Sequence, residues 1–435
     1  MKKITSLIIT LLACVSAWAQ YQPTEEVLKS RQDFQDEKFG IFIHWGIYSM
    51  IGHGEWVMDK ENINYKEYRH LADGFYPSKF NAEEWVQAFK AAGAKYITFT
   101  SRHHDSFSMF KTATSNYNIV DGTPFKRDVL KELADACQKH GMKLHVYYSH
   151  ADWNRLDYPQ GWSAIRTGRP TNQENFDSYL QFMKQQLTEI LTNYGPVRCI
   201  WFDGHWDQKN RKNFDWHLDE QYALIHKLQP ACMVANNHHY APKPGEDIQL
   251  FEQDLPGENT AGYSGTSKIG QLPLETCLTM NKTWGYDITD KKYKSNSYLI
   301  QKLVQAAGKN ANLLLNIGPR PDGQLPVEAV ERLKAMGEWL NKYGETVYGT
   351  RGGIVAPHEW GVSTQKGNKL YIHILKWNDR GLFLPITDTK VLKAVMFDGK
   401  QPITVTRTKA GVVLELPEVP KGVDTIVELT LQAKK

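Results

Sequence analysis

The segment with the clearest capacity for chemistry is CIWFDG, residues 199–204, where an apolar run ends in an acid and a glycine. The run reads as a buried strand, and a carboxylate at the carboxyl end of a strand stands where α/β barrels place reactive groups. Trp201 points to the same side as Asp203 because side chains alternate along a strand. Trp206 and Asp207 follow at once. An acid among indoles is typical of sugar sites, although an aspartate here could also simply cap the next turn.

Other reactive residues also come directly after predicted strands. They are His44, His103, His104, His238 and Glu252. In a barrel the carboxyl ends of the strands meet at one face, so we expect these side chains to lie close together. Taken singly, His44 could be a hydrogen-bonded core histidine. The HHD run at 103–105 could be half of a metal site, but no third ligand has a suitable spacing and neighbouring residues on a strand point opposite ways.

The elements that position these residues alternate between strand and helix about eight times over roughly 320 residues. The predicted strands are continuous apolar runs, which indicates a parallel sheet covered on both faces. A (β/α)8-type barrel is the natural closure of that pattern. Predicted strands occupy residues 38–45, 95–101, 143–148, 197–202, 231–235, 248–251 and 312–317, and predicted helices 24–37, 81–92, 128–140, 175–194, 219–228, 295–307 and 327–343.

The pattern changes after Gly349, where short strands separated by polar turns replace the strand–helix alternation. The predicted strands there are 369–375, 380–384, 391–397, 403–407, 411–416 and 425–431. They indicate a C-terminal antiparallel β-sandwich. The expected organisation is a leader at 1–19, a catalytic barrel at 20–349 and the sandwich at 350–435.

Composition excludes some classes of function. The chain has 435 residues, 41% hydrophobic and 23% charged, with a formal net charge of +4. No long basic run accompanies that charge, so nucleic acid is not an expected partner. The 13 tryptophans and 21 tyrosines suit carbohydrate binding.

The first residues have the features of a secretory signal. Two lysines precede an apolar stretch at 4–15, and Ala17-Trp18-Ala19 is a small-x-small cleavage site. The mature protein is therefore expected to be exported, to the periplasm or the exterior. A lipoprotein anchor at Cys14 is the alternative, although Leu12 fits that pattern poorly. No other stretch is long and apolar enough to span a membrane.

Six motifs, in the expected order and with the expected spacing, resemble those of glycoside hydrolase family 29, the α-L-fucosidases, and a bacterial exported member of that family is expected. They are FGIFIHWG (39–46), GEW (54–56), HHD (103–105), VYYS (146–149), WFDG (201–204) and NLLLNIGP (312–319). The resemblance covers about residues 35 to 345. It implies a catalytic barrel followed by a β-sandwich, in agreement with the pattern above.

The resemblance also implies roles for particular residues. Asp203 would be the nucleophile. The fucose pocket would be lined by His44, Glu55, Trp56, His103, His104, Tyr147 and Trp201. Tryptophans would shelter the apolar ring face and the 5-methyl group, while the polar groups would bind the hydroxyls. WGY at 284–286 matches a further family segment, so Trp284 is expected to add an aromatic wall.

The resemblance leaves the acid/base open among Glu252, Glu258 and Glu275. Glu252 closes a predicted strand, and its spacing from the strand before it favours it, with Glu275 supporting the pocket residues from behind. Relatives often carry an arginine after the strand that ends at Asn236, where this chain offers His238.

The expected activity is that of a retaining α-L-fucosidase acting on fucosylated oligosaccharides or glycoconjugates, with a glycosyl-enzyme on Asp203 and no cofactor or metal. Two alternatives belong to other classes. One is a fucose-binding protein that has lost catalysis, and the other is a metal-dependent hydrolase built on the histidines. Linkage preference and oligomeric state are not determined by the sequence.

Overall fold

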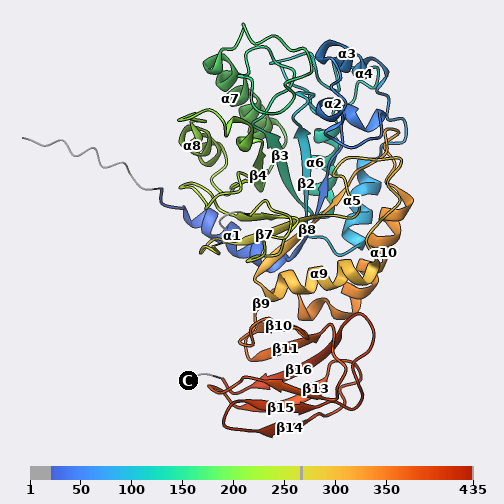
Figure 1. Ribbon diagram of the computed structural model, residues 1–435, viewed down its shortest axis with the longest axis vertical. Helices are drawn as coiled ribbons and strands as arrows, with labels where there is room; N and C mark the ends of the chain where they lie inside the picture. Colours follow the sequence, from blue (N-terminus) through green and yellow to red (C-terminus); the bar gives the residue numbers. More distant parts are fainter. Residues whose placement is uncertain (1–20, 265–267, 434–435) are drawn as a thin grey trace, which may run out of the picture.

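The computed structural model describes residues 21–264 and 268–433 (Figure 1). The expected leader at 1–19, including the alternative anchor at Cys14, lies outside the described residues. Within them, no helix has the length and apolar character needed to cross a membrane.

Eight parallel strands form the central sheet, in the order β5-β4-β3-β2-β1-β8-β7-β6. Their bounds are β1 Phe39–Ile43, β2 Tyr96–Arg102, β3 Lys143–Ser149, β4 Cys199–Asp203, β5 Met233–Asn236, β6 Gln249–Glu252, β7 Leu274–Thr279 and β8 Ala311–Ile317. The barrel closes between β5 and β6 through a single bridge, Ala235 to Ile248. The expected barrel is therefore confirmed, with one weakly paired seam.

Helices surround the barrel, and α9 and α10 stand between it and the C-terminal strands (Figure 1). They are α1 Glu25–Glu37, α2 Val57–Lys60, α3 Tyr65–Arg69, α4 Leu71–Gly74, α5 Ala82–Ala91, α6 Val129–His140, α7 Phe176–Asn193, α8 Leu218–Leu228, α9 Asn296–Gly308 and α10 Val327–Tyr343, with short 3-10 turns η1 Ile47–Met50, η2 His205–Gln208 and η3 Gly344–Thr346. On either side of β6, the described residues of 237–248 and 253–273 form loops instead of helices.

Capping side chains begin α6 and α7, and a glycine ends α6. Asp128 Oδ1 accepts a hydrogen bond of 3.0 Å from the Lys131 amide at the start of α6. Gly141 ends that helix with φ of 68°, in the left-handed region that glycine adopts at low cost. Asn175 Oδ1 caps α7 in the same way, through the amide of Ser178.

Side chains fill the amino-terminal half of the barrel. Phe34 of α1 is fully buried against Tyr96, with ring centroids 5.4 Å apart. The Phe34 carbonyl accepts a hydrogen bond of 2.7 Å from Asn312 Nδ2 on β8. Above them Phe42, Tyr147 and other rings form an interior cluster. The cavity described below lies at the opposite, carboxyl-terminal face.

The C-terminal strands form two antiparallel sheets, ordered β13-β16-β11-β10-β9 and β12-β15-β14, around a core of their own. The strands are β9 Arg351–Gly352, β10 Gly361–Lys366, β11 Lys369–Ile374, β12 Gly381–Leu384, β13 Val391–Met396, β14 Thr404–Arg407, β15 Val412–Glu415 and β16 Thr425–Leu431. The sandwich is confirmed, but β10 was not predicted. Its buried Ser363 and Thr364 hydroxyls donate hydrogen bonds to the carbonyls of Val355 and Thr346. Polar residues can therefore occupy core positions in this strand.

Candidate active site

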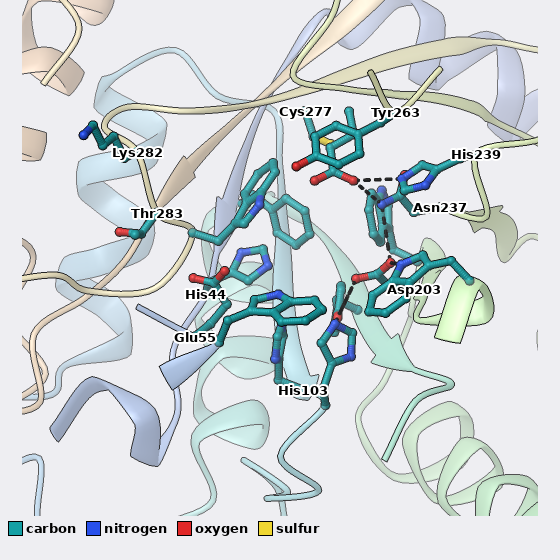
Figure 2. A pocket seen from close by; sticks show the side chains of 18 of the residues that line it. His44, Glu55, His103, Asp203, Asn237, His239, Tyr263, Cys277, Lys282 and Thr283 are labelled. Carbon is teal, nitrogen blue, oxygen red and sulfur yellow. Dashed lines mark hydrogen bonds and ion pairs between the residues drawn. The ribbon is translucent and has the colours of Figure 1, made fainter. Parts of the chain in front are cut away.

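A cavity of about 480 Å³ opens at the carboxyl-terminal face of the barrel (Figure 2). Asp203 and His239 lie on one side of it, with His44 and Glu55 opposite. The structure brings together both expected catalytic carboxylates and eight of the nine expected substrate-binding residues. The residues that line the cavity as expected are Asp203, Glu252, His44, Glu55, Trp56, His103, His104, Tyr147, Trp201 and Trp284.

Asp203 ends β4 and receives hydrogen bonds on both carboxylate oxygens. The Tyr147 hydroxyl donates to Oδ2 at 3.0 Å, and Trp206 Nε1 donates to Oδ1 at 3.0 Å. Burial raises the pKa of Asp203, while the backbone amide of Gly204 and these two donors oppose the rise. The carboxylate is thus held in a fixed orientation among aromatic rings.

Glu252 ends β6 and lies within reach of Asp203. Asn237 Nδ2 donates to Glu252 Oε2 at 2.8 Å and also contacts Asp203 Oδ1 at 3.4 Å. His239 Nε2 lies 3.0 Å from the same Oε2 atom. Because the same nitrogen contacts both oxygens, Oδ1 and Oε2 can be no farther apart than the sum of these two distances, 6.2 Å.

The other two acid/base candidates lie outside the cavity lining. Glu275 of β7 is fully buried in the barrel interior, where it accepts hydrogen bonds from the Tyr96 hydroxyl at 2.6 Å and Trp201 Nε1 at 2.9 Å. Burial raises the pKa of Glu275 to about 7. Glu258 forms an ion pair of 2.9 Å with Lys309. Neither carboxylate is presented to a bound molecule.

His238 does not line the cavity, which corrects the expectation for that residue. Its ring is buried, with Nε2 3.0 Å from Glu246 Oε1, and its Nδ1 accepts a hydrogen bond from the Tyr240 amide. His239 lines the cavity instead. β5 ends at Asn236 and His239 has a φ of 66°, so strand alternation does not determine which of the two side chains faces the cavity.

His44 follows β1 and has a defined proton position. Its Nδ1 lies 2.7 Å from Asn316 Oδ1, and Asn316 Nδ2 donates to the Trp284 carbonyl at 2.7 Å. The amide orientation makes Oδ1 the acceptor, so Nδ1 carries the proton and Nε2 is a hydrogen-bond acceptor. Burial lowers the pKa of His44 to about 3, so the ring is neutral at neutral pH.

His104 has the same tautomer for a similar reason. Ser149 Oγ donates to the Ala151 carbonyl at 2.7 Å and accepts from His104 Nδ1 at 2.6 Å. His104 Nε2 is then an acceptor, 3.5 Å from Asp203 Oδ2. Burial lowers the pKa of His104 to about 3. Two neutral imidazoles therefore offer acceptors, a suitable arrangement for binding donor hydroxyls.

His103 and His104 lie side by side, with ring centroids 4.1 Å apart. The expectation that neighbouring side chains here point opposite ways was wrong. The register of β2 shifts between Thr100 and Arg102, and the strand ends there, so alternation no longer applies. Even so, within 21–264 and 268–433 no group of three or more His, Cys, Asp or Glu side chains could hold a metal ion.

Aromatic rings form the rest of the wall. Trp56 stacks on Trp206 with centroids 5.4 Å apart and 23° between the planes. Trp201 stacks on Tyr147 at 5.6 Å and 23°. Glu55 is held by the Gly285 amide, which donates to its Oε2 at 2.7 Å, and burial raises its pKa.

Sequence reasoning missed several lining residues that come from long loops. They include Trp162, Lys209, Asn237, His239 and Tyr263. Asn237 could have been found, since it follows β5 with inward parity. Trp162 and Tyr263 could not have been found in this way. They lie in loops, where side chains follow neither the alternation of a strand nor the repeat of a helix.

Comparison with known proteins identifies the family to which the chain belongs. The α-L-fucosidase family model matches residues 9–345. The plasma α-L-fucosidase of Rattus norvegicus is 32% identical over 457 aligned residues, covering 95% of this chain and 93% of that protein. The human plasma enzyme is 30% identical and covers 92% of this chain and 89% of its own length.

Solved structures show the same fold. α-L-Fucosidase isoenzyme 1 from Paenibacillus thiaminolyticus superposes with a TM-score of 0.83 at 32% identity, covering 94% of this chain and 100% of that one. A GH29 α-L-fucosidase from Bacteroides thetaiotaomicron, trapped as a covalent intermediate with 2-fluoro-fucosyl fluoride in a glutamate-to-glutamine variant, gives 0.82 at 26%, covering 95% and 98%. The chain described here belongs to the α-L-fucosidase family and is a glycoside hydrolase.

Proposed function

We propose that the protein hydrolyses terminal α-linked L-fucose with retention of configuration, by a double displacement. The observation that carries this proposal is the pair Asp203 and Glu252, bridged by one Asn237 nitrogen. One oxygen of each carboxylate therefore lies close to the other, which is compatible with the separation of about 5–5.5 Å between the two carboxyl groups of retaining enzymes.

Asp203 attacks the anomeric carbon while Glu252 protonates the leaving oxygen, and Glu252 then activates water to release the sugar. The covalent intermediate trapped in the Bacteroides thetaiotaomicron relative supports this order of events. Asp203 suits the role of nucleophile because both its oxygens are oriented by donors and it sits at the cavity wall.

The remaining residues suit a 6-deoxy sugar. The Nε2 atoms of His44 and His104 accept hydrogen bonds from ring hydroxyls, and Trp201 and Trp284 offer apolar faces to the ring and its methyl group. Substrates are therefore fucosylated oligosaccharides or glycoconjugates. The features of residues 1–19 support an exported enzyme, acting in the periplasm or the exterior.

One experiment tests the function and its stereochemistry. Purified protein is incubated with an aryl α-L-fucoside while proton NMR follows the anomeric signal of the first-formed fucose. The α-anomer is expected first, followed by mutarotation. Initial β-anomer would refute retention, and absence of fucose from aryl and natural fucosides would refute the activity.

A further inference from the structure

The two oxygens of Glu252 have different surroundings. Oε2 accepts from Asn237 Nδ2 at 2.8 Å and lies 3.0 Å from His239 Nε2. In the described part of the chain, no hydrogen bond reaches Oε1. Since Glu252 lines the cavity, Oε1 is the oxygen that remains for a substrate.

This asymmetry fixes where the acid proton sits. The Asn237 amide nitrogen can only donate, and an ionised carboxylate can only accept. His239 Nε2 therefore carries a hydrogen whenever Glu252 is ionised. With two N–H groups directed at Oε2, a proton on the carboxyl group occupies Oε1, which faces the leaving oxygen.

Charged and titratable groups surround the His239 ring from every neighbouring element. These are Glu252 of β6, Asp203 of β4, His205 of η2, Lys209 just after η2, and Tyr263, whose ring lies 5.4 Å from the imidazole. Burial disfavours the charged ring, but Glu252 and then Asp203 outweigh it, so the pKa of His239 lies above its usual value despite Lys209. Burial keeps His205 neutral, with a pKa of about 2.

The backbone also directs His239 toward Glu252. Its φ of 66° lies in the left-handed region, which side chains rarely adopt. Residues held in such conformations concentrate at functional sites, where surrounding contacts must maintain them. Here the maintained contact is that of the ring with the Glu252 carboxylate.

We propose that His239 is a positioning residue: it donates to Glu252 Oε2, so that the acid proton sits on Oε1, and it shares the titrating proton of that carboxyl group. The inference rests on the proposed fucosidase function. Two hydrogen-bonded groups titrate as a pair, and the pair with one proton includes the form with Glu252 protonated and His239 neutral. That form supplies the acid.

Glu252 Oε1 loses its proton in the first step of the reaction and regains one in the second. In the first step the bond from Asp203 to the anomeric carbon forms, the glycosidic bond breaks, and the Oε1 proton moves to the leaving oxygen. In the second, water attacks the anomeric carbon, its proton moves to Oε1, and the bond to Asp203 breaks. His239 keeps its Nε2 proton and stabilises the Glu252 anion between the steps by donating to Oε2.

The test is the pH dependence of kcat/KM for His239→Gln, on a natural fucosylated glycan and on an aryl fucoside with an acidic phenol. Gln keeps an N–H donor but cannot titrate. On the glycan we expect the alkaline limb to move to lower pH by roughly one unit, because Gln cannot take up the shared proton, while the rate above the limb stays within about twofold. The acidic phenol of the aryl substrate departs without help from an acid. On that substrate the position of the limb should not change, and kcat/KM of the variant should stay within about twofold of the wild-type value.

His238→Gln is the matched control, because the adjacent ring contacts Glu246 and lies outside the cavity. Its profiles should match the wild type on both substrates. His239→Gly provides a second variant that tolerates the positive φ, and added imidazole should restore its alkaline limb on the glycan.

The outcomes separate the two proposals. Unchanged limbs in His239→Gln, or equal losses on both substrates, would overturn the role of His239 while leaving the fucosidase assignment intact. A wild-type protein that releases no fucose from either substrate would overturn both.

Discussion

Replacing Glu275 with Gln should stabilise the protein at alkaline pH and leave it almost unchanged at acidic pH. Protonated Glu275 accepts from Trp201 Nε1 on one oxygen and can donate to the Tyr96 hydroxyl with the other. A glutamine amide reproduces that pattern, with its oxygen toward Trp201 and its nitrogen toward Tyr96. The side chain of the Glu275→Gln variant would thus resemble the protonated acid at every pH.

The magnitude follows from linkage. The pKa of Glu275 is about 7 in the folded protein, against 4.5 for an ordinary glutamate. Between pH 4.5 and about 7 Glu275 is protonated in the folded state and ionised in the unfolded state. The free energy of unfolding therefore falls as the pH rises, by on the order of 3 kcal/mol in total. The loss begins near the unfolded value and is complete above about 7. For a chain of this length 3 kcal/mol corresponds to a Tm difference of roughly 3 °C.

The assay compares unfolding of the wild type and Glu275→Gln at pH 5 and pH 8, by tryptophan fluorescence in urea and by thermal scans. The variant should gain stability at pH 8 relative to pH 5, and it should retain fucosidase activity because Glu275 does not line the cavity. Equal destabilisation at both pH values would refute the reasoning. Loss of activity with the leaving-group dependence of an acid/base would instead assign that role to Glu275.

Further predictions concern the reaction itself. Asp203→Ala should lose nearly all turnover while staying folded, and azide should partly restore it; full activity would contradict the nucleophile. Glu252→Ala should lose far more rate on a natural glycan than on an activated aryl fucoside, with a burst on the latter and a fucosyl azide of retained configuration when azide is added. Trp206→Phe removes a donor that holds the pKa of Asp203 down, so the acid limb of kcat/KM should move to higher pH; an unmoved limb would exclude that contribution. Activity should persist with EDTA, whereas loss reversed by zinc would favour a metal-dependent hydrolase.

The parts of this structure that could be predicted depend on regular periods. Apolar runs such as β1, with all five residues buried, identify barrel strands without further context. Asp203 could be placed because it ends such a run on the same side as Trp201.

The sequence did not predict residue positions correctly where the alternation of side chains along a strand ends or is interrupted. His238 was expected in the pocket because it follows the strand that ends at Asn236, where relatives often carry an arginine. The chain leaves the strand at that point, and His239 lines the cavity instead. The register shift in β2 brings both His103 and His104 to the cavity, which no alternation rule would indicate. Strand β10 was not predicted because its sequence is polar. Its buried hydroxyls donate to carbonyls of residues outside the strand, and the sequence pattern does not show those partners.

The single bridge between β5 and β6 has a consequence for local opening. Neighbouring strands of the barrel are joined by several paired residues, whereas this seam has one bridged pair, Ala235 and Ile248, beside the Asp247 amide that donates to the Val234 carbonyl. Few backbone hydrogen bonds there mean a low free energy of local unfolding, so its amides should exchange with deuterium sooner than those of β1 or β2. Asn237 and Glu252 stand on opposite sides of the seam and are linked by a side-chain hydrogen bond. A ligand that contacts both residues would therefore stabilise the seam against local opening. Protection of backbone amides from hydrogen exchange on ligand binding should be greatest along β5 and β6.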